Sequence, residues 1–251
     1  MPDAYITFRK LHESGCFVLP NPWDVGSARR LAAKGFKALA STSAGAAWTL
    51  GKADGEITLD ECLAHLRMLC TATDLPVNAD FEGGFADSPA DVASNVVRAL
   101  GTGIAGLSIE DRTGNALYPI EVGVERIRAA RTAIDRTEPR ALLVGRTEGF
   151  LIGRDDLTEV IARLKAYSDA GADVLYPPGL RTLDQIAEVV TAVAPKPVNV
   201  LLGFVDASVS ELAAAGVRRL STGAALAAAS WNALAKAADT LIETGRLPQR
   251  N

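Results

Sequence analysis

The chain has 251 residues, of which 48% are hydrophobic, and its formal net charge is −4 at pH 7. This length suits one large core, and the charge leaves no basic stripe to neutralise phosphates, so we expect no nucleic-acid partner. No apolar run approaches the ~20 residues of a membrane span, and the first ten residues hold no apolar signal segment. We therefore expect a cytoplasmic protein with no membrane contact.

Eight short apolar runs are spread evenly along the chain, and segments with helical spacing separate them. Continuous apolar runs of this length are typical of parallel strands that helices cover on both faces. We predict strands at Phe17–Trp23, Ala38–Ser43, Val77–Glu82, Gly106–Asp111, Leu142–Glu148, Val174–Pro178, Val198–Leu202 and Arg218–Thr222.

Helix boundaries are marked in the sequence between these runs. Capping boxes, in which a hydroxyl and an acid or amide three residues later satisfy backbone N–H groups, occur at Thr58/Glu61, Thr182/Gln185 and Ser208/Glu211. Glycines that suit the left-handed end of a helix precede four runs, at Gly35, Gly103, Gly171 and Gly216. The first strand leads into Pro20–Asp24 with no glycine-rich phosphate turn, which argues against an open doubly wound sheet.

Eight strands alternating with helices predict the α/β class and a (β/α)8 TIM barrel that forms a single domain over residues 1–251. In such a barrel, the C-terminal strand ends meet on one face and carry the chemistry. Acidic residues lie at or just beyond these ends, at Asp54, Asp80, Glu82, Glu110 and Glu148. Carboxylates brought so close repel one another unless a cation holds them.

Asp80 and Glu82 share one side of the third strand because side chains alternate along a strand. Two carboxylates followed by Gly83 and Gly84 form an oxygen-rich corner that suits Mg²⁺, with Mn²⁺ as the alternative ion. The competing interpretation is a pair of solvated acids at the start of a loop.

Arg146 lies inside an apolar strand, where an unpaired charge is costly. At a barrel mouth, its guanidinium is suited to bind an anionic substrate through two parallel hydrogen bonds. A structural ion pair with Glu148 or Glu110 is the alternative. The second strand runs into residues 41–45, Ser-Thr-Ser-Ala-Gly, whose backbone N–H groups are candidates to hold an oxyanion. A plain polar turn would have the same composition.

Taken together, these segments resemble the isocitrate lyase/phosphoenolpyruvate mutase superfamily over roughly residues 15–205. The matching motifs are N-P-W-D-V-G-S-A-R at 21–29, L-G-x-x-D at 50–54, D-x-E-x-G-F at 80–85, I-E-D at 109–111, G-R-T-E at 145–148 and A-Y-x-x-A-G-A-D at 166–173. Their order and placement on the strands carry the likeness. The family binds Mg²⁺ and an α-keto acid or its enolate at the barrel mouth, which implies a small-molecule carboxylate substrate.

The resemblance also implies roles for individual residues. Asp80 would ligate the metal directly, and three further acids would act mostly through metal-bound waters: Asp54, Glu82 and Glu110. Glu82 stands where the family more often has aspartate. Arg146 would bind the substrate carboxylate. Further substrate contacts are implied for Trp23, Asp24, Asn199 and the N–H groups of either Ser43 with Ala44 or Ser41 with Thr42.

The chain departs from the family after the fourth strand. Residues 111–119 read D-R-T-G-N-A-L-Y-P and lack the K-[KR]-C-G-H motif, whose cysteine is the acid/base of the family's carbon–carbon lyases. Only Asn115 has a counterpart in the phosphonomutase branch. We therefore expect a branch without the K-K-C-G-H loop, in which Tyr118, Asn115 or Ser43 orders the proton donor.

The function predicted on this basis is a Mg²⁺-dependent lyase that decarboxylates a small 2-oxo acid, or cleaves a C–C bond in it, through an enolate. The predicted catalytic residues are Arg146, Glu110, Asp54 and Asn115. One alternative is a mutase or hydrolase that acts on the P–C bond of a phosphonopyruvate-like or phosphoenolpyruvate-like compound. The other is a non-catalytic α-keto acid binder.

The segment from Ala224 to Thr244 is helical in pattern and rich in alanine, which allows close approach of helices. In the family, the last helix commonly packs on a neighbouring subunit, so the resemblance implies a homodimer or homotetramer. An ordinary helix that closes the barrel is the alternative.

Overall fold

The computed structural model describes residues 3–248 and places eight parallel strands among them. They are β1 (Phe17–Leu19), β2 (Leu39–Ala40), β3 (Val77–Asp80), β4 (Gly106–Glu110), β7 (Leu142–Arg146), β8 (Val174–Tyr176), β9 (Asn199–Leu201) and β10 (Arg219–Ser221). Each strand lies inside one of the eight predicted runs, so the strand predictions are confirmed. The strands are shorter than predicted because most runs leave the hydrogen-bonded ladder at their C-terminal ends.

The strands form one curled parallel sheet whose order follows the chain. Hydrogen bonding divides it into the groups β1-β10-β9 and β2-β3-β4-β7-β8. A parallel bridge between Leu175 and Val198 joins β8 to the beginning of β9. On the other side, the amide of Ala40 donates to the Pro20 carbonyl at 3.1 Å and joins β2 to the end of β1. The α/β class and the curled parallel sheet are confirmed, and the strand order is the one that a (β/α)8 barrel requires.

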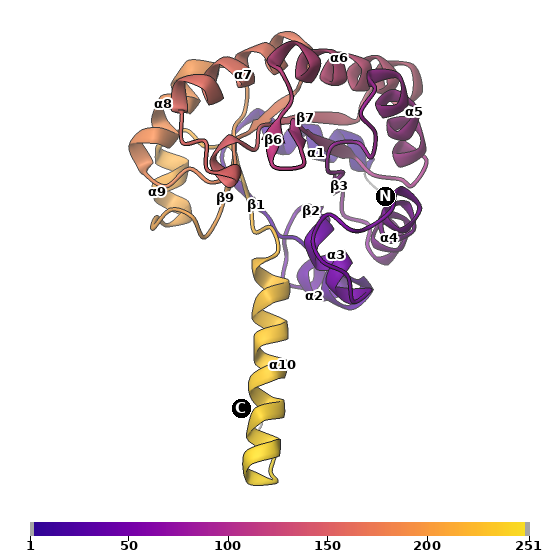
Figure 1. Ribbon diagram of the computed structural model, residues 1–251, viewed down its shortest axis with the longest axis vertical. Coiled ribbons are helices and arrows are strands. Elements are labelled where there is room, and N and C mark those ends of the chain that lie inside the picture. Colours follow the sequence, from indigo (N-terminus) through magenta and orange to yellow (C-terminus); the bar gives the residue numbers. More distant parts are fainter. Residues whose placement is uncertain (1–2, 249–251) are drawn as a thin grey trace.

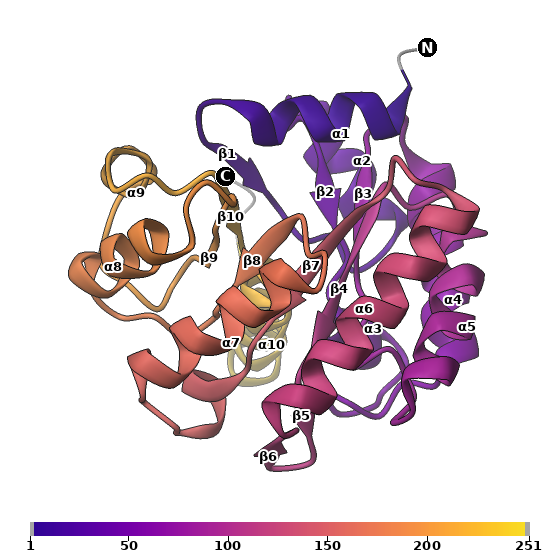
Figure 2. The ribbon, with the colours of Figure 1, turned by 90° about the horizontal axis from the view of Figure 1, so that it is seen from above.

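Helices follow the strands and surround the sheet. They are α1 (Ala4–Glu13), α2 (Val25–Ala33), α3 (Ser43–Thr49), α4 (Leu59–Ala72), α5 (Pro89–Leu100), α6 (Ile120–Thr137), α7 (Leu157–Asp169), α8 (Leu183–Val193), α9 (Val209–Ala214) and α10 (Ala225–Thr244), with a short 3₁₀ helix η1 (Gly149–Ile152). Helices α4 to α9 lie around the outside of the sheet in chain order (Figure 2). None of the helices in residues 3–248 combines the length and the apolar character needed to cross a membrane.

The local signals at the helix ends are confirmed. The capping boxes of α4, α8 and α9 form both of their reciprocal hydrogen bonds. The four glycines that precede strands all have positive φ: 89° at Gly35, 94° at Gly103, 107° at Gly171 and 89° at Gly216. These caps end each helix sharply, so the next strand starts at the same end of the sheet.

The two ends of the sheet differ in chemistry. At the N-terminal strand ends, Phe8 of α1 is fully buried against Ala38, Ala105 and Leu142. Above it, the interior contains Arg219, whose Nε donates to Asn199 Oδ1 at 2.9 Å. The inside of the sheet therefore changes from apolar at the α1 end to polar toward the C-terminal strand ends.

The fold has two further features, of which the first was not expected from the sequence. The loop after β4 contains an antiparallel hairpin of β5 (Arg112–Thr113) and β6 (Ala116–Leu117). Helix α10 projects away from the rest of the chain (Figure 1), and Ala227 is its one buried residue.

The close approach of β4 to β7 gives a test of the packing. A Cβ added at Gly106 would lie 2.8 Å from the carbonyl oxygen of Leu142, which is too close for real Cβ atoms. We expect Gly106→Ala to lower the free energy of unfolding by about 1–3 kcal/mol in denaturant titrations. Gly26→Ala is the control because its Cβ would meet nothing closer than 3.4 Å in the first turn of α2. Equal stability of the two variants would contradict the packing described.

Candidate active site

Arg146, the last residue of β7, lies at the centre of a group of carboxylates. Its Nη1 is 3.1 Å from Asp80 Oδ1 and 3.0 Å from Glu110 Oε1, and its Nε donates to Glu148 Oε1 at 2.6 Å. The strands β3, β4 and β7 are neighbours in the sheet, so their C-terminal residues converge at this point. One guanidinium thus forms ion pairs with three carboxylates.

Asp80 is also fixed from the other side. Its Oδ2 accepts hydrogen bonds from the Ser43 amide at 2.9 Å and the Ser43 hydroxyl at 2.8 Å. The Ser41 hydroxyl accepts from the Asp80 amide at 2.8 Å. The end of β2 and the start of α3 therefore hold Asp80 in place beside Arg146.

Negative charge exceeds positive charge around Arg146. The pKa of Glu82 is raised to about 7. Burial is the main cause, the carboxylates of Asp80 and Asp54 add to the rise, and Arg146 opposes it less strongly. Burial also raises the pKa of Glu110 well above its usual range despite the adjacent Arg146, and Glu148 adds to the rise. The Oε1 atom of Glu82 is buried without a hydrogen-bond partner. The side chains of the site therefore carry too little positive charge to balance their carboxylates.

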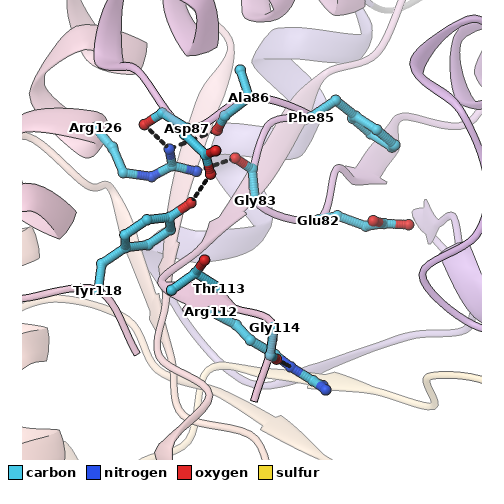
Figure 3. Close-up of a pocket in the computed structure, with 10 residues that line it drawn as sticks. All are labelled: Glu82, Gly83, Phe85, Ala86, Asp87, Arg112, Thr113, Gly114, Tyr118 and Arg126. Carbon is cyan, nitrogen blue, oxygen red and sulfur yellow. Dashed lines mark hydrogen bonds between the residues drawn. The ribbon is translucent and has the colours of Figure 1, made fainter. Parts of the chain in front are cut away.

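These side chains border a cavity of about 380 Å³ at the C-terminal strand ends. Its wall includes Ser43, Asp54, Glu82, Glu110, Arg112, Arg146, Glu148 and Leu151. A second pocket of about 360 Å³ adjoins it and shares Glu82, Gly83, Arg112 and Gly114 (Figure 3). The tip of the β5–β6 hairpin and the start of the loop after β3 therefore separate the two spaces.

A second buried network supports the site from behind. Asp111 is 2% exposed and accepts hydrogen bonds from the Glu148 amide at 2.9 Å and the Tyr167 hydroxyl at 2.7 Å. Arg163 approaches Asp111 at 3.3 Å and donates to the Tyr118 carbonyl at 2.9 Å. Helix α7 thereby fixes both the turn that carries Glu148 and the residue that follows the hairpin.

The donor set fits a hard divalent cation. Within residues 3–248, no three Asp, Glu, His or Cys side chains stand close enough to enclose a metal ion by themselves. An ion here would take few direct protein ligands and would complete its shell with water and substrate oxygens, which Mg²⁺ commonly does. The unpartnered Glu82 Oε1 and the surplus of carboxylates are what such an ion would satisfy.

The structure brings together part of the predicted site. Ser43, Asp54, Glu82, Glu110 and Arg146 line the cavity, and Asp80 contacts Ser43 and Arg146 directly. The remaining predicted residues lie outside the cavity wall: Trp23, Asp24, Ser41, Thr42, Ala44, Asn115 and Asn199.

Several of these outlying residues have structural partners. Asp24 caps α2, and Thr42 caps α3 through the amide of Gly45. Asn199 is buried and donates to the Ser221 hydroxyl at 2.9 Å. Asn115 lies in the two-residue turn of the hairpin. The hydroxyl of Tyr118 donates to Asp87 in the neighbouring pocket (Figure 3).

The hairpin that carries Arg112 was not expected from the sequence. Arg112 lines both spaces, and its Nε donates to the Gly114 carbonyl at 2.6 Å. The signal was present in the sequence, because Gly114-Asn115 is a dipeptide that favours a two-residue hairpin turn, and Gly114 has a φ of 56°.

Comparison with known proteins gives a consistent set of relatives. The family model for phosphoenolpyruvate phosphomutase matches residues 8–242. A crystal structure of a protein from Burkholderia cenocepacia that is named as a lyase or mutase superimposes with a TM-score of 0.94. The two sequences are 46% identical, and the match covers 97% of this chain and 89% of that one.

Two curated enzymes are also similar. The 2-methylisocitrate lyase of Escherichia coli is 34% identical over 63% of this chain and 56% of the enzyme. The oxaloacetate decarboxylase of Pseudomonas putida is 30% identical over 74% of this chain and 66% of the enzyme.

The pKa of Glu82 predicts how the metal-free protein responds to pH. In the folded protein the pKa of Glu82 is about 7, above the ordinary 4.5. The contribution of the protonated Glu82 carboxyl to stability is therefore complete below pH 4.5 and is lost as the pH rises through 7. Glu82→Gln keeps a neutral side chain at every pH. In the presence of a chelator, we expect the Tm of Glu82→Gln to rise relative to the Tm of the wild type as the pH is raised from 5 to 8. A constant difference in Tm across this range would contradict the assigned pKa.

Proposed function

This chain belongs to the isocitrate lyase/phosphoenolpyruvate mutase superfamily, and we propose that it is a divalent-metal-dependent lyase of small 2-oxo acids. The observation that carries the proposal is the placement of Arg146 among Asp80, Glu110 and Glu148 at the wall of the cavity. Such a site combines one fixed cation for an anionic substrate with the carboxylates that a Mg²⁺ or Mn²⁺ ion needs. The curated relatives named above are lyases, which supports the reaction class.

Arg146 is positioned to bind the substrate carboxylate. Its Nε and Nη1 are engaged by acids, whereas its Nη2 makes no hydrogen bond to any residue between 3 and 248. The Tyr176 ring lies below the guanidinium, with its centroid 5.1 Å from Cζ. The arginine is therefore held in one orientation with its Nη2 group free, which orients an anionic ligand at little entropic cost.

The metal would be held by Asp80 directly and by Glu82, Glu110 and Asp54 largely through water. When bound, it supplies the positive charge that stabilises an electron-rich transition state. In a decarboxylation, the bond between C3 and the leaving carboxylate breaks, CO₂ departs, and the electron pair remains on C3 in conjugation with the 2-oxo group. A proton must then reach C3.

Glu110 and Ser43 are the groups best placed to manage that proton. Glu110 lines the cavity beside Arg146, where its carboxylate can hold a water that carries the proton. The Ser43 hydroxyl lines the same cavity and is anchored to Asp80. Tyr118 is a poorer candidate than the sequence indicated because it lines the neighbouring pocket, where its hydroxyl is bonded to Asp87. Among residues 3–248, no cysteine lines the cavity, so cleavage that depends on a cysteine acid is disfavoured.

Chemistry at a P–C bond is the second candidate, but it has less support. It requires several contacts to a phosphonate or phosphate group, and Arg112 is the one cation that the hairpin places at the cavity wall. Decarboxylation of an oxaloacetate-like acid needs fewer positive contacts from the hairpin, because the leaving group, CO₂, is neutral.

A substrate panel tests the proposed function. Purified protein with Mg²⁺ is incubated with oxaloacetate, phosphonopyruvate or 2-methylisocitrate while pyruvate and phosphate are measured. We expect pyruvate from oxaloacetate in excess of the metal-only background. Lysine keeps the positive charge but lacks the planar set of N–H donors of the guanidinium. Arg146→Lys should therefore lower kcat/KM about 100-fold or more. Arg30→Lys, on the exposed side of α2, should leave kcat/KM unchanged.

Each other outcome assigns a different function. Conversion of phosphonopyruvate to phosphoenolpyruvate, or phosphate release from it, would favour P–C chemistry. Cleavage of 2-methylisocitrate would show that the hairpin replaces the missing cysteine motif. Tight binding of oxalate without turnover of any compound would favour the binder.

We also propose that α10 packs against a second copy of the chain. Trp231, Leu234 and Leu241 recur at helical spacing and are 42%, 59% and 43% exposed, and Ile242 beside them is 82% exposed. An apolar stripe on a projecting helix is a typical contact surface between subunits (Figure 1).

The oligomer has a simple test. We expect light scattering after size-exclusion chromatography to give a dimer or tetramer. Leu234→Asp should shift this species toward monomer, whereas Asn232→Asp, at an exposed position on the same helix, should not. A wild-type monomer at high concentration would contradict the proposal.

A further inference from the structure

The loop after β3 has an unusual backbone. Within residues 3–248, positive φ outside glycine occurs at Glu82 (46°) and Phe85 (54°), and both belong to this loop. A side chain in the left-handed region is sterically unfavourable and persists only where surrounding contacts fix the conformation. Glu82 is also the residue whose carboxylate lines the cavity. The contacts that hold this loop therefore decide where an acid of the site points.

Arg126 of α6 supplies those contacts. Its Nη1 donates to the carbonyls of Ala86 at 2.6 Å and Asp87 at 2.5 Å, and its Nη2 donates to the carbonyl of Gly83. The residue is 1% exposed, and these partners are backbone carbonyls rather than carboxylates. Its Nε is buried without a partner, so Nη1 and Nη2 make all three of these bonds to the loop. Three bonds from one buried guanidinium to one loop are a strong conformational constraint.

Neighbouring residues are fitted to this arginine. A Cβ at Gly83 would lie 3.2 Å from Arg126 Nη2, so glycine gives the guanidinium room to reach the loop. The Tyr118 ring lies over the guanidinium, with its centroid 4.4 Å from Cζ, and its hydroxyl donates to Asp87. Figure 3 shows Arg126, Asp87 and Tyr118 gathered on one side of the pocket, with Glu82 on the other.

The same loop is linked to a second acid of the site. The carbonyl of Glu82 accepts a hydrogen bond from the Glu110 amide at 2.9 Å. A change in the backbone at Glu82 would therefore disturb the spacing of both carboxylates. On its far side, the loop is held by Asn95, whose amide donates to the Gly84 carbonyl at 3.0 Å.

We propose that Arg126 is a positioning residue that acts through Glu82. By holding the carbonyls of residues 83–87, it keeps the loop in its left-handed course and places the Glu82 carboxylate in the cavity. The inference rests on the proposed function insofar as Glu82 serves a divalent cation, but its structural part stands without it. Tyr118 extends the effect, since it joins the hairpin to the same guanidinium.

Arg126→Met tests the proposal, because it keeps the apolar stem and removes the donors. At a temperature where the variant is folded, we expect the Gly84 amide to exchange with solvent about tenfold faster, while the Ala105 amide, which donates to the Val77 carbonyl, is unchanged. Mn²⁺ affinity, measured calorimetrically without substrate, should fall about tenfold or more. Arg126→Lys should recover part of both losses. Arg131→Met is the control, because it is on the same helix and removes the ion pair to Asp173, away from the cavity.

Lower thermal stability with unchanged Gly84 exchange and unchanged Mn²⁺ affinity would overturn the proposal and make Arg126 a purely structural residue. If the wild type itself binds no Mn²⁺, the metal assignment fails, and the exchange measurement still decides whether Arg126 holds the loop. Should Arg126→Met not fold, Gly83→Ala perturbs the same contact more mildly and is expected to show the same pattern.

Discussion

The structure depends on an imbalance of charge at the C-terminal ends of the strands. Arg146 alone faces Asp80, Glu110 and Glu148 within hydrogen-bonding distance, and Glu82 and Asp54 line the same cavity. Burial makes this imbalance costly, as the raised pKa values of Glu82 and Glu110 indicate. The protein can relieve it by taking up protons or by binding a cation. The cation proposed above would turn an unfavourable cluster into a site that attracts and polarises an anionic substrate.

Much of the surrounding structure serves to keep these acids in place. Asp111 fixes the Glu148 amide and is in turn bonded to Tyr167, and the Ser43 amide and hydroxyl fix Asp80. These contacts give a physical reason for two of the matched motifs, since I-E-D supplies Asp111 and A-Y-x-x-A-G-A-D supplies its partner Tyr167. A group of like charges stays together only when each member is held by neutral or positive neighbours, and here these neighbours come from β2, α3 and α7.

The strands and the convergence of the acids could be predicted from the sequence, because apolar periodicity locates parallel strands and a barrel brings their ends together. The position of Glu82 could not. In Phe81-Glu82-Gly83-Gly84-Phe85, the glycines would be expected to take the left-handed conformation, yet Glu82 and Phe85 take it as well as Gly84. Arg126 was equally hidden, because its partners are backbone carbonyls 39–43 residues away, which leave no side-chain pattern to recognise. The hairpin was readable from Gly114-Asn115, whereas the orientation of Tyr118 toward Asp87 depends on tertiary packing.

We propose that a divalent cation replaces protons in this carboxylate group. The most direct measurement is calorimetric titration of metal-free protein with Mn²⁺ near pH 6.5 in buffers of different ionisation enthalpy, which gives both the stoichiometry and the number of protons released. We expect one site per chain and a net release of protons, and we expect Asp80→Asn to abolish both. Binding without proton release, or no binding at all, would contradict it.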